Sequence, residues 1–402
     1  MTAFVDPRAR LRFWGLAGAT FLAFTTVTAT ALLAVVLRLY GLADHQIGVV
    51  LAVYGAPVVM GNLLAGPVIA RLGVARVIRL ALAIMLLAYL SFHVTAASFV
   101  GACLSRFLQG VGFGLFLPTA MVYAKAQLTP ARMTYYFGIF SAMVPLPNVI
   151  GPALADLYLG RGDPGLFFVV TAIPLLAGAL LGGAVVGEAR STPETGGGRY
   201  ADLLADRRLW MPFVGVFTVG SVFGFVSSFM ALFLLGEGVA VVYFFSTFTV
   251  CFFGGRVLAV PFFERTPKWA AVMVALILMC AGFLLLIVPG GTTPTLVVAG
   301  GIVFGLGYTV AYPQLSVWVA EYFAPTARGR PIGLFNAFFN AGIYLTPLWT
   351  GVSMAAIGLR GPMLILCAAS LSVAAMLAVY GRRFALAGAP AVARGDGAPP
   401  GG

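Results

Sequence analysis

Long apolar runs separated by short polar segments are the main pattern of the chain. A helix needs about 20 residues to cross a hydrocarbon core of roughly 30 Å, and twelve runs are close to that length or exceed it. The predicted spans are 13–36, 46–67, 77–95, 98–123, 134–155, 166–187, 211–235, 240–263, 269–289, 295–319, 331–353 and 362–380. The pattern predicts an all-α membrane protein with twelve transmembrane helices.

The first apolar run, 13–36, is longer than the core of a secretory signal, which has roughly 7–15 apolar residues and a small-residue cleavage site. It follows a segment that contains three arginines, and it continues into Leu37 and Arg38. We therefore expect an uncleaved first helix.

The composition excludes a water-soluble globular protein. Apolar residues make up 61% of the chain and charged residues 9%, against about 25% charged residues in ordinary globular proteins. The net charge of +12 does not indicate nucleic-acid binding, because the basic residues fall in short groups between apolar runs. The four cysteines form no C-x-x-C pair and there are only two histidines, so the sequence predicts no disulfide framework, no metal site and no cofactor.

The distribution of basic residues predicts the orientation of the chain in the membrane. If the N-terminus is cytoplasmic, 19 of the 24 Lys and Arg residues lie in cytoplasmic segments, and only Arg38, Arg161 and Arg360 lie in outer loops. Cytoplasmic loops of membrane proteins carry such an excess of positive charge. We therefore expect a multi-pass protein of the cell inner membrane with both termini in the cytoplasm.

An internal repeat predicts two related halves. Shifting the second half by 194–195 residues aligns Gly110 and Gly112 with Gly305 and Gly307, together with several prolines. The predicted organisation is an N-terminal six-helix half at 1–187, a cytoplasmic linker at 188–208, a C-terminal half at 209–383 and a disordered tail at 384–402. Parallel repeats around an axis normal to the membrane place a cavity between them, near mid-bilayer.

Three motifs resemble those of the major facilitator superfamily (MFS). Gly66, Arg71 and Gly73 fit a G-x-x-x-D-R-x-G-R pattern after the second helix, with Ala70 in place of its Asp. In the second half, the corresponding segment is Glu264-Arg265. The fourth helix carries Arg106-x-x-Gln109-Gly110, similar to R-x-x-Q-G, and the fifth carries Gly151-Pro152, similar to the centre of an exporter motif. The resemblance covers nearly the whole chain, and it implies two pseudo-symmetric six-helix bundles, alternating access and export.

Two arginines lie inside predicted spans, where a charged side chain costs roughly 2.5–3.5 kcal/mol on insertion scales. Arg106 either couples protons or anchors a carboxylate or phosphate of the solute, or it is a structural residue bonded to neighbouring helices. Arg256 either faces the cavity, or extends toward the cytoplasm and pairs with a loop acid such as Glu321.

Polar and aromatic residues that recur at helical spacing predict the faces that line the cavity, although Ser and Thr also mediate helix packing in membranes. The candidates for solute binding or coupling are Arg106, Gln109, Thr25, Phe225, Arg256, Tyr308, Tyr312, Asn336 and Asn340. The candidates for gating are Gly66, Arg71, Gly73, Gly151, Pro152, Glu264 and Arg265.

Carboxylates are absent from the middle of the predicted spans, which disfavours a cationic solute and favours a neutral or anionic one. Proton coupling would then use Asp44, Asp156 or Glu237 at the outer edge, or Arg106 through the solute. The sequence predicts a secondary transporter of a small organic solute, acting as a proton-coupled exporter and as a monomer. An importer of a small anionic metabolite is the alternative.

Functions of other classes have less support. An intramembrane enzyme needs a nucleophile with a nearby base or a metal set, and an ATP-driven pump needs a Walker-type motif; the sequence has neither pattern. A sensor and a channel are further alternatives, but Gly- and Pro-punctuated repeated helices fit alternating access better.

Overall fold

The computed structural model describes residues 3–129, 132–159, 164–187, 200–264, 266–288, 292–323 and 329–387. These residues are helical apart from turns, short connections and one isolated bridge between Phe4 and Leu128. The predicted all-α class is confirmed.

Six spans form the N-terminal half. They consist of α1 (Pro7–Ala29), η1 (Thr30–Leu32) and α2 (Leu33–Leu39); α3 (Asp44–Val53) and α4 (Gly55–Leu72); α5 (Val74–Thr95); α6 (Phe99–Ala126); α7 (Met133–Ala142), η3 (Leu146–Asn148) and α8 (Ile150–Leu159); and α9 (Pro164–Val185). Every predicted span of this half corresponds to one of these units, with ends that differ by a few residues.

Six further spans form the C-terminal half, after the short helix α10 (Tyr200–Ala205). They are α11 (Arg207–Ser228) with α12 (Met230–Gly236), α13 (Val242–Glu264), α14 (Lys268–Leu286), α15 (Pro294–Glu321), α16 (Gly329–Ile357) and α17 (Arg360–Ala387). By length and composition alone, ten of the described helical units are apolar enough to cross a membrane. Two others complete the twelve: α13, whose described apolar part is Val242–Gly255, and α16, in which Asn336 and Asn340 interrupt the apolar run.

Some spans are broken where the sequence predicted continuous helices. In the first span, Thr30 donates its hydroxyl to the carbonyl of Val27 at 2.6 Å, at the 3₁₀ turn between α1 and α2. In the fifth span, Pro145 and Pro147 flank the start of η3 and lack the N–H group that a continuous helix requires. Residues at both breaks line the cavity that lies between the two halves.

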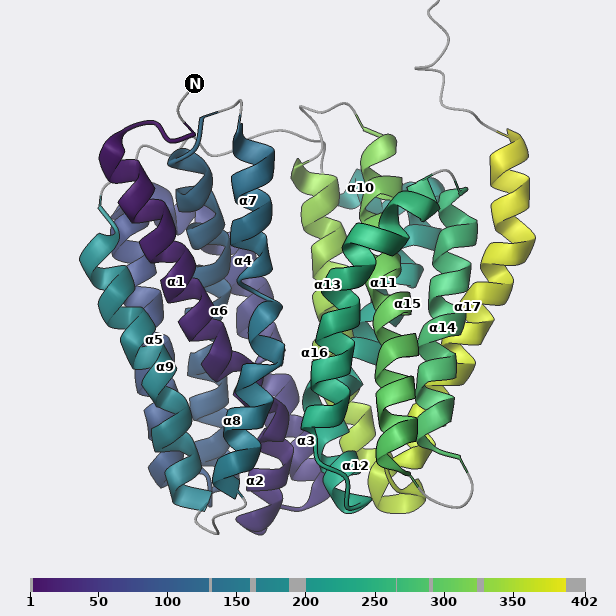
Figure 1. Cartoon of the computed structure of the whole chain (residues 1–402), viewed down its shortest axis with the longest axis horizontal. Helices are drawn as coiled ribbons and strands as arrows, with labels where there is room; N and C mark the ends of the chain where they lie inside the picture. Colours follow the sequence, from purple (N-terminus) through teal and green to yellow (C-terminus); the bar gives the residue numbers. More distant parts are fainter. Residues whose placement is uncertain are drawn as a thin grey trace, which may run out of the picture.

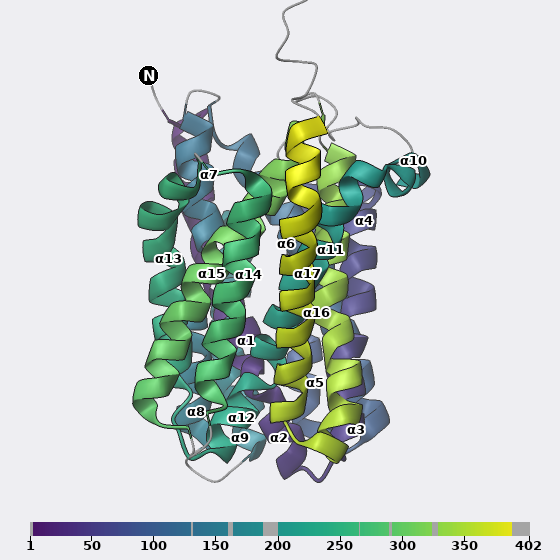
Figure 2. The same ribbon diagram turned by 90° about the vertical axis from the view of Figure 1, so that its right-hand side faces the viewer.

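The predicted linker and tail are described only in part. Residues 188–199 lie outside the described residues, whereas α10 falls within the segment predicted as linker, and α11 begins at Arg207. Figure 2 places α10 beside the end of the bundle at which α1 begins. The last helix continues to Ala387, and 388–402 lie outside the described residues.

The two halves stand side by side as two bundles (Figure 1). The beginning of α1 and the end of α17 lie at the same end of the molecule, and α2, α8 and α12 lie toward the opposite end. Contacts between the halves include α3 with α16, and η1 with α11 and α12. In the first of these contacts, a Cβ atom at Gly351 would lie 2.7 Å from Cα of Gly48, so the two backbones touch.

The packing of equivalent glycines supports the internal repeat. A Cβ atom at Gly112 would lie 2.8 Å from the carbonyl oxygen of Ala81, and one at Gly307 would lie 2.6 Å from that of Ala275. Both pairs are related by the offset found in the sequence. Small residues allow such close helix crossings in membranes, and here the same crossing occurs once in each half.

Candidate functional site

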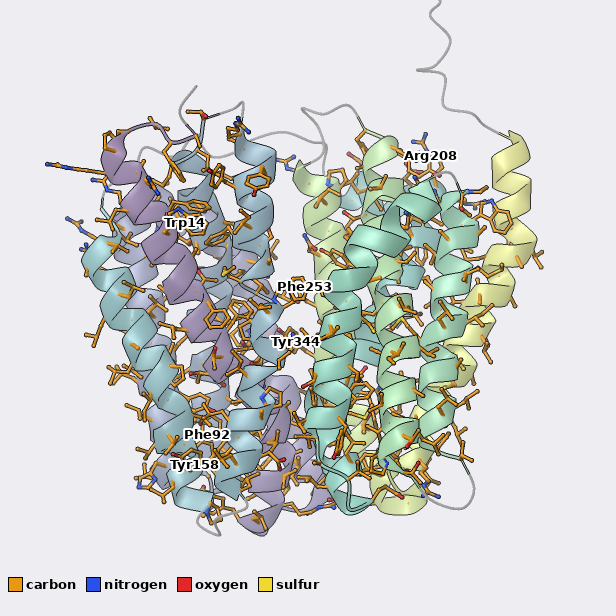
Figure 3. The ribbon with its side chains drawn as sticks, viewed as in Figure 1. Trp14, Phe92, Tyr158, Arg208, Phe253 and Tyr344 are labelled. Carbon is orange, nitrogen blue, oxygen red and sulfur yellow. The ribbon has the colours of Figure 1, made fainter. Side chains whose placement is uncertain are left out.

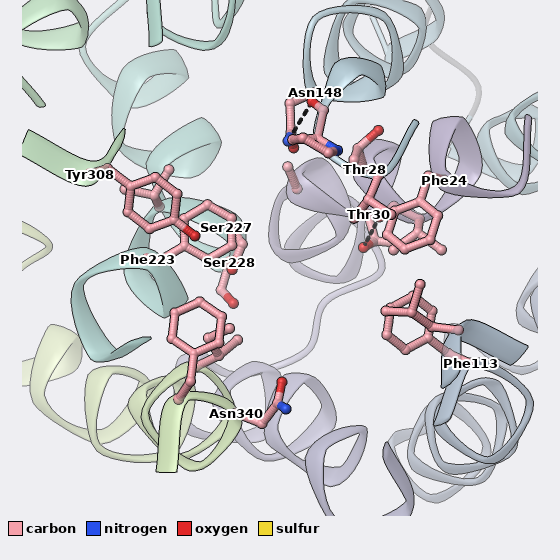
Figure 4. Close-up of a pocket in the computed structure, with 18 of the residues that line it drawn as sticks. Phe24, Thr28, Thr30, Phe113, Asn148, Phe223, Ser227, Ser228, Tyr308 and Asn340 are labelled. Atoms are coloured by element: carbon pink, nitrogen blue, oxygen red, sulfur yellow. Dashed lines mark hydrogen bonds between the residues drawn. The ribbon is translucent and has the colours of Figure 1, made fainter. Parts of the chain in front are cut away.

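A cavity of about 550 Å³ lies between the halves, which is the size of typical small-molecule sites. Its walls come from α1, η1, α3, α6, α7 and η3 of one half and from α11, α13, α15 and α16 of the other. Figure 4 shows Phe24, Thr28, Thr30 and Phe113 on one side and Phe223, Ser227, Ser228 and Tyr308 on the other. The cavity is therefore lined by residues of both halves.

Arg106 is the single charged residue among those that line the cavity in the described part of the chain. It lies on α6 and is 8% exposed. Its Nη1 donates to Oε1 of Gln109 at 2.5 Å, while its Nε is buried without a hydrogen-bond partner. The guanidinium carbon lies 4.2 Å from the ring centroid of Tyr54, a distance at which the ring face attracts a cation.

Tyr54 connects this arginine to the opposite half. Its ring lies 5.3 Å from that of Tyr344, which belongs to α16, and 5.7 Å from that of Phe113. Its hydroxyl is buried without a hydrogen-bond partner. Figure 3 places Tyr344 between the two bundles, about midway between the end with Trp14 and the end with Tyr158. The environment of Arg106 is thus built by both halves.

The C-terminal side of the cavity is an aromatic wall, which we define as Phe223, Phe248, Phe252 and Tyr308. Phe223 and Tyr308 stack with ring centroids 4.9 Å apart and planes inclined by 20°. The rings of Phe248 and Phe252 each lie 5.6 Å from that of Tyr308. These distances lie within the range of favourable aromatic pairs, so the wall is a packed surface of ring faces and edges.

Several polar side chains of the cavity bond to nearby backbone. Thr28 donates to the carbonyl of Pro147 at 3.0 Å, and Asn148 donates to that of Pro145 at 2.9 Å. Across the cavity, Asn340 donates to the carbonyl of Asn336 at 2.9 Å. These bonds satisfy donors within the membrane-spanning part of the protein, where an unpaired donor is costly.

The predicted binding residues either line the cavity, lie directly behind its lining residues, or lie away from it. Arg106, Tyr308, Tyr312 and Asn340 line the cavity. Gln109 and Asn336 lie behind it: the first accepts a bond from Arg106, and the second accepts one from the hydroxyl of Tyr312 at 2.6 Å. For Arg256, side-chain placement lies outside what the structure describes.

Thr25 and Phe225 are not among the lining residues. Thr25 is buried and donates to the carbonyl of Phe21 at 3.0 Å. Phe225 is fully buried inside the C-terminal half, with its ring 5.7 Å from that of Phe283. Each lies on the correct helix, but its neighbours Thr28 and Ser228 are the residues that face the cavity.

The predicted gating residues have separate structural roles. Gly73 ends α4 with a φ of 79°, a left-handed conformation that favours glycine. A Cβ atom at Gly66 would meet nothing within 4 Å, and the side chain of Arg71 is exposed. The side chains of Glu264 and Arg265 lie outside the described part of the chain.

Gly151 and the adjacent Pro152 are buried at the start of α8. A Cβ atom at Gly151 would lie 2.6 Å from the carbonyl oxygen of Thr25 and would collide with the hydroxyl of Thr28. The glycine of the exporter-like motif therefore permits α8 to cross α1 closely, beside the cavity.

The residues that sequence reasoning missed are mainly aromatic: Phe24, Tyr54, Phe113, Phe223, Phe248 and Phe252. With 33 Phe and 14 Tyr in the chain, an aromatic residue carries little information by itself. The internal repeat held a usable signal, because Tyr54 and Phe248 are related by its offset and each packs against an equivalent glycine, Gly110 or Gly305.

The family model for the Major Facilitator Superfamily matches residues 15–294 and 243–398. The chain belongs to the Major Facilitator Superfamily. It therefore has the twelve-helix fold of two pseudo-symmetric six-helix bundles, and it is a membrane transporter and not an enzyme. These findings confirm the resemblance and the class of function predicted from the sequence.

Individual relatives agree with this family. The staphylopine export protein of Staphylococcus aureus is 24% identical over 324 residues, which cover 76% of this chain and 79% of the relative. An uncharacterised MFS-type transporter of Pseudomonas aeruginosa is 27% identical over 162 residues, or 40% of each chain.

Solved structures of other MFS transporters share the fold. A bacterial homologue of the human lysosomal transporter Spinster has a TM-score of 0.77 at 17% identity, covering 96% of this chain and 99% of that one. A nucleoside transporter has a TM-score of 0.78 at 15% identity, covering 92% of this chain and 99% of that one. At these identities the similarity concerns the fold alone.

Proposed function

We propose that this MFS protein exports a small organic solute by alternating access, in exchange for protons, and that it acts as a monomer. The observation that carries this proposal is the cavity lined by two pseudo-symmetric halves that contact each other at one end. Rocking of one half against the other would open such a cavity to alternate sides. The similarity to a staphylopine export protein supports the outward direction.

The proposed location is the inner membrane, with both termini in the cytoplasm. The excess of basic residues in the segments on the N-terminal side supports this orientation. The contacts of α3 with α16 then lie toward the outer side, as expected for a state that takes up its solute from the cytoplasm. A reporter fused to the C-terminus should be active only as a cytoplasmic enzyme; activity as a periplasmic enzyme would contradict the orientation.

For the proton, we favour Asp156 over the other edge carboxylates. Asp44 pairs with Arg38 at 2.5 Å, and Glu237 pairs with Arg360 at 2.9 Å. Asp156, on α8, has no ion pair among the described residues and is only partly exposed. A carboxylate without a fixed positive partner can gain and lose a proton more freely than one held by an arginine.

The function is tested by comparing metabolites inside and outside cells that contain or lack the protein. An exporter depletes its solute inside the cell and enriches it outside. Proteoliposomes with an imposed pH gradient then test whether protons drive the movement. Accumulation inside the cell would favour the alternative, an importer of a small anionic metabolite, and no movement of any solute would contradict both.

A further inference from the structure

The repeat allows the two walls of the cavity to be compared position by position. At the repeat offset, Arg106 corresponds to Gly301 and Gln109 corresponds to Phe304. Tyr54 corresponds to Phe248. The correspondence also holds in space, because a Cβ atom at Gly110 would meet the carbonyl oxygen of Tyr54 at 2.5 Å, and one at Gly305 would meet that of Phe248 at 2.9 Å. The N-terminal half therefore carries a guanidinium and an amide where the C-terminal half has a glycine and an aromatic ring, and both halves keep an aromatic ring at the third position.

The N-terminal wall has hydrogen-bonding capacity at Arg106 that the protein does not use. An arginine side chain has five N–H donors, and Arg106 donates to Gln109 alone among the described hydrogen bonds. The described ion pairs do not include Arg106, and no carboxylate is found among the described lining residues. The unpaired hydroxyl of Tyr54 lies in the same group. A buried, uncompensated cation beside a cavity is the partner that an anion requires.

The single positive charge of the site limits the charge of the anion that it can neutralise. A phosphate monoester carries about −1.5 to −2 charges at neutral pH, whereas a carboxylate carries one. One guanidinium matches one carboxylate, which it binds through two parallel hydrogen bonds. A cation would meet Arg106 without a carboxylate to offset the repulsion.

The aromatic wall determines the rest of the solute. Phe223, Phe248 and Tyr308 present apolar ring surfaces, with the stacked pair Phe223 and Tyr308 at its centre. A flat apolar group gains both burial and ring contacts on such a surface. A small sugar or amino acid with polar groups all round would leave these rings in contact with unpaired donors and acceptors.

We propose that the solute is an amphipathic monoanion: a carboxylate held by Arg106, on a planar apolar body that lies against the aromatic wall. This proposal rests on the proposed transport function and specifies its substrate class. Arg106 selects charge, and the aromatic wall selects shape, so the two halves of the protein each bind one part of the solute.

Three probes separate these contributions: 2-naphthoate, 2-naphthamide and acetate. The first has both the ring system and the charge, the second has the ring system alone, and the third has the charge alone. Binding is measured by isothermal titration with the full chain in lipid nanodiscs, and empty nanodiscs measure partition into lipid. We expect 2-naphthoate to bind at least 10-fold more tightly than either other probe, because a charge-assisted hydrogen bond is worth about one to two decades of affinity.

Variants assign the two effects to the two walls. Arg106→Gln should reduce naphthoate affinity to that of naphthamide while naphthamide affinity stays unchanged. Tyr308→Ala should weaken both naphthyl probes by a similar factor and preserve their ratio. The matched control is Arg76→Gln, which removes an exposed arginine of α5 far from the cavity wall and should change neither affinity. Thermal unfolding of each variant with no probe present monitors folding.

Equal affinities for naphthoate and naphthamide, or preference for the naphthyl cation 2-naphthylmethylammonium, would overturn the proposal. So would absence of naphthoate binding to a folded protein. The proposed function is judged separately by metabolite comparison: export of a cationic or sugar-like solute would refute the substrate class and preserve the transporter. Naphthoate binding without solute movement under any gradient would refute transport and preserve the site.

Discussion

The two halves of this transporter share their packing and differ in the chemistry of the cavity. Gly112 and Gly307 make the same helix crossing in each half. In the N-terminal half, Arg106 lies over the ring of Tyr54, whereas the C-terminal half has Gly301 and Phe248 at the positions related by the repeat. The glycine crossings keep the symmetry of the repeat, and Tyr54 and Phe248 keep an aromatic ring in each half. The guanidinium of Arg106 has no counterpart in the C-terminal half.

The difference has an energetic basis. A guanidinium inside a membrane protein costs roughly 2.5–3.5 kcal/mol on insertion scales, and the face of Tyr54 and the amide of Gln109 offset part of this cost. The aromatic wall carries no charge, so it has no comparable insertion cost, and its rings pack against one another. The cost of this charge agrees with the proposed role of Arg106 in binding the anionic group of the solute.

The largest effect should come from placing the arginine in the wrong half. In Gly301→Arg, the new side chain would collide with the hydroxyl of Thr247 and find aromatic neighbours in place of Gln109. Overpacking of about 1–3 kcal/mol adds to the cost of the charge, so the yield of folded protein should fall at least 10-fold in detergent gel filtration. Gly301→Ala is the milder control. Normal yield of Gly301→Arg would show that the two halves are interchangeable at this position.

The second-largest effect tests whether transport requires the close contact between α3 and α16. Gly351→Leu inserts a side chain where the backbones of α3 and α16 meet, beside Gly48, and should destabilise the state closed at that end. Gly333→Leu is the matched control on the same helix, since a Cβ atom there meets nothing within 4 Å. Solute flux in proteoliposomes should fall more than 10-fold for Gly351→Leu and stay near wild type for Gly333→Leu. Equal fluxes would argue against a moving contact at this end.

Proton coupling should depend on Asp156 and not on the paired carboxylates. We expect Asp156→Asn to lose most of the flux driven by a pH gradient while exchange of solute at equal concentrations continues. Glu237→Gln, which removes a carboxylate already bound to Arg360, should lose no more than about half. The comparison is refuted if Glu237→Gln is the more damaging of the two.

The smallest effect concerns the start of the C-terminal half. Asp206 caps α11 by accepting from the backbone N–H of Arg208 at 3.0 Å, and hydrogen bonds from Arg208 lower its pKa. A carboxyl with a lowered pKa stabilises the fold above its unfolded pKa, and this contribution is lost as the pH falls through its folded pKa. Asp206→Asn should change local stability by less than about 1 kcal/mol. Fluorescence of Trp210 should report fraying of α11 on acidification in the wild type, and a variant that frays with the same pH dependence would exclude this carboxyl.

The spans were predictable from the sequence because the thickness of the bilayer sets the length of the apolar run that a transmembrane helix needs. The break at η1 was not, since Thr30 is compatible with a continuous helix, and its hydroxyl bond to the carbonyl of Val27 is of a kind that Thr218 and Thr247 also make inside unbroken helices. Similarly, Arg106 could be singled out because a charge in an apolar run is rare, whereas Tyr54 could be found only by comparing the two repeats. Thr25 and Phe225 lie on helices that line the cavity without lining it themselves, because most of each helix is buried and helical spacing alone does not separate cavity-facing positions from packed ones.

The most direct test of a solute pathway between the halves is to block it with one modified residue. In a variant without native cysteines, Asn340→Cys places a thiol on the cavity wall, and a membrane-impermeant maleimide is applied from the side of the termini while solute flux is followed. We predict that the thiol reacts from this side, that added 2-naphthoate slows the reaction, and that complete labelling abolishes flux. Full flux after complete labelling would contradict a pathway through this cavity.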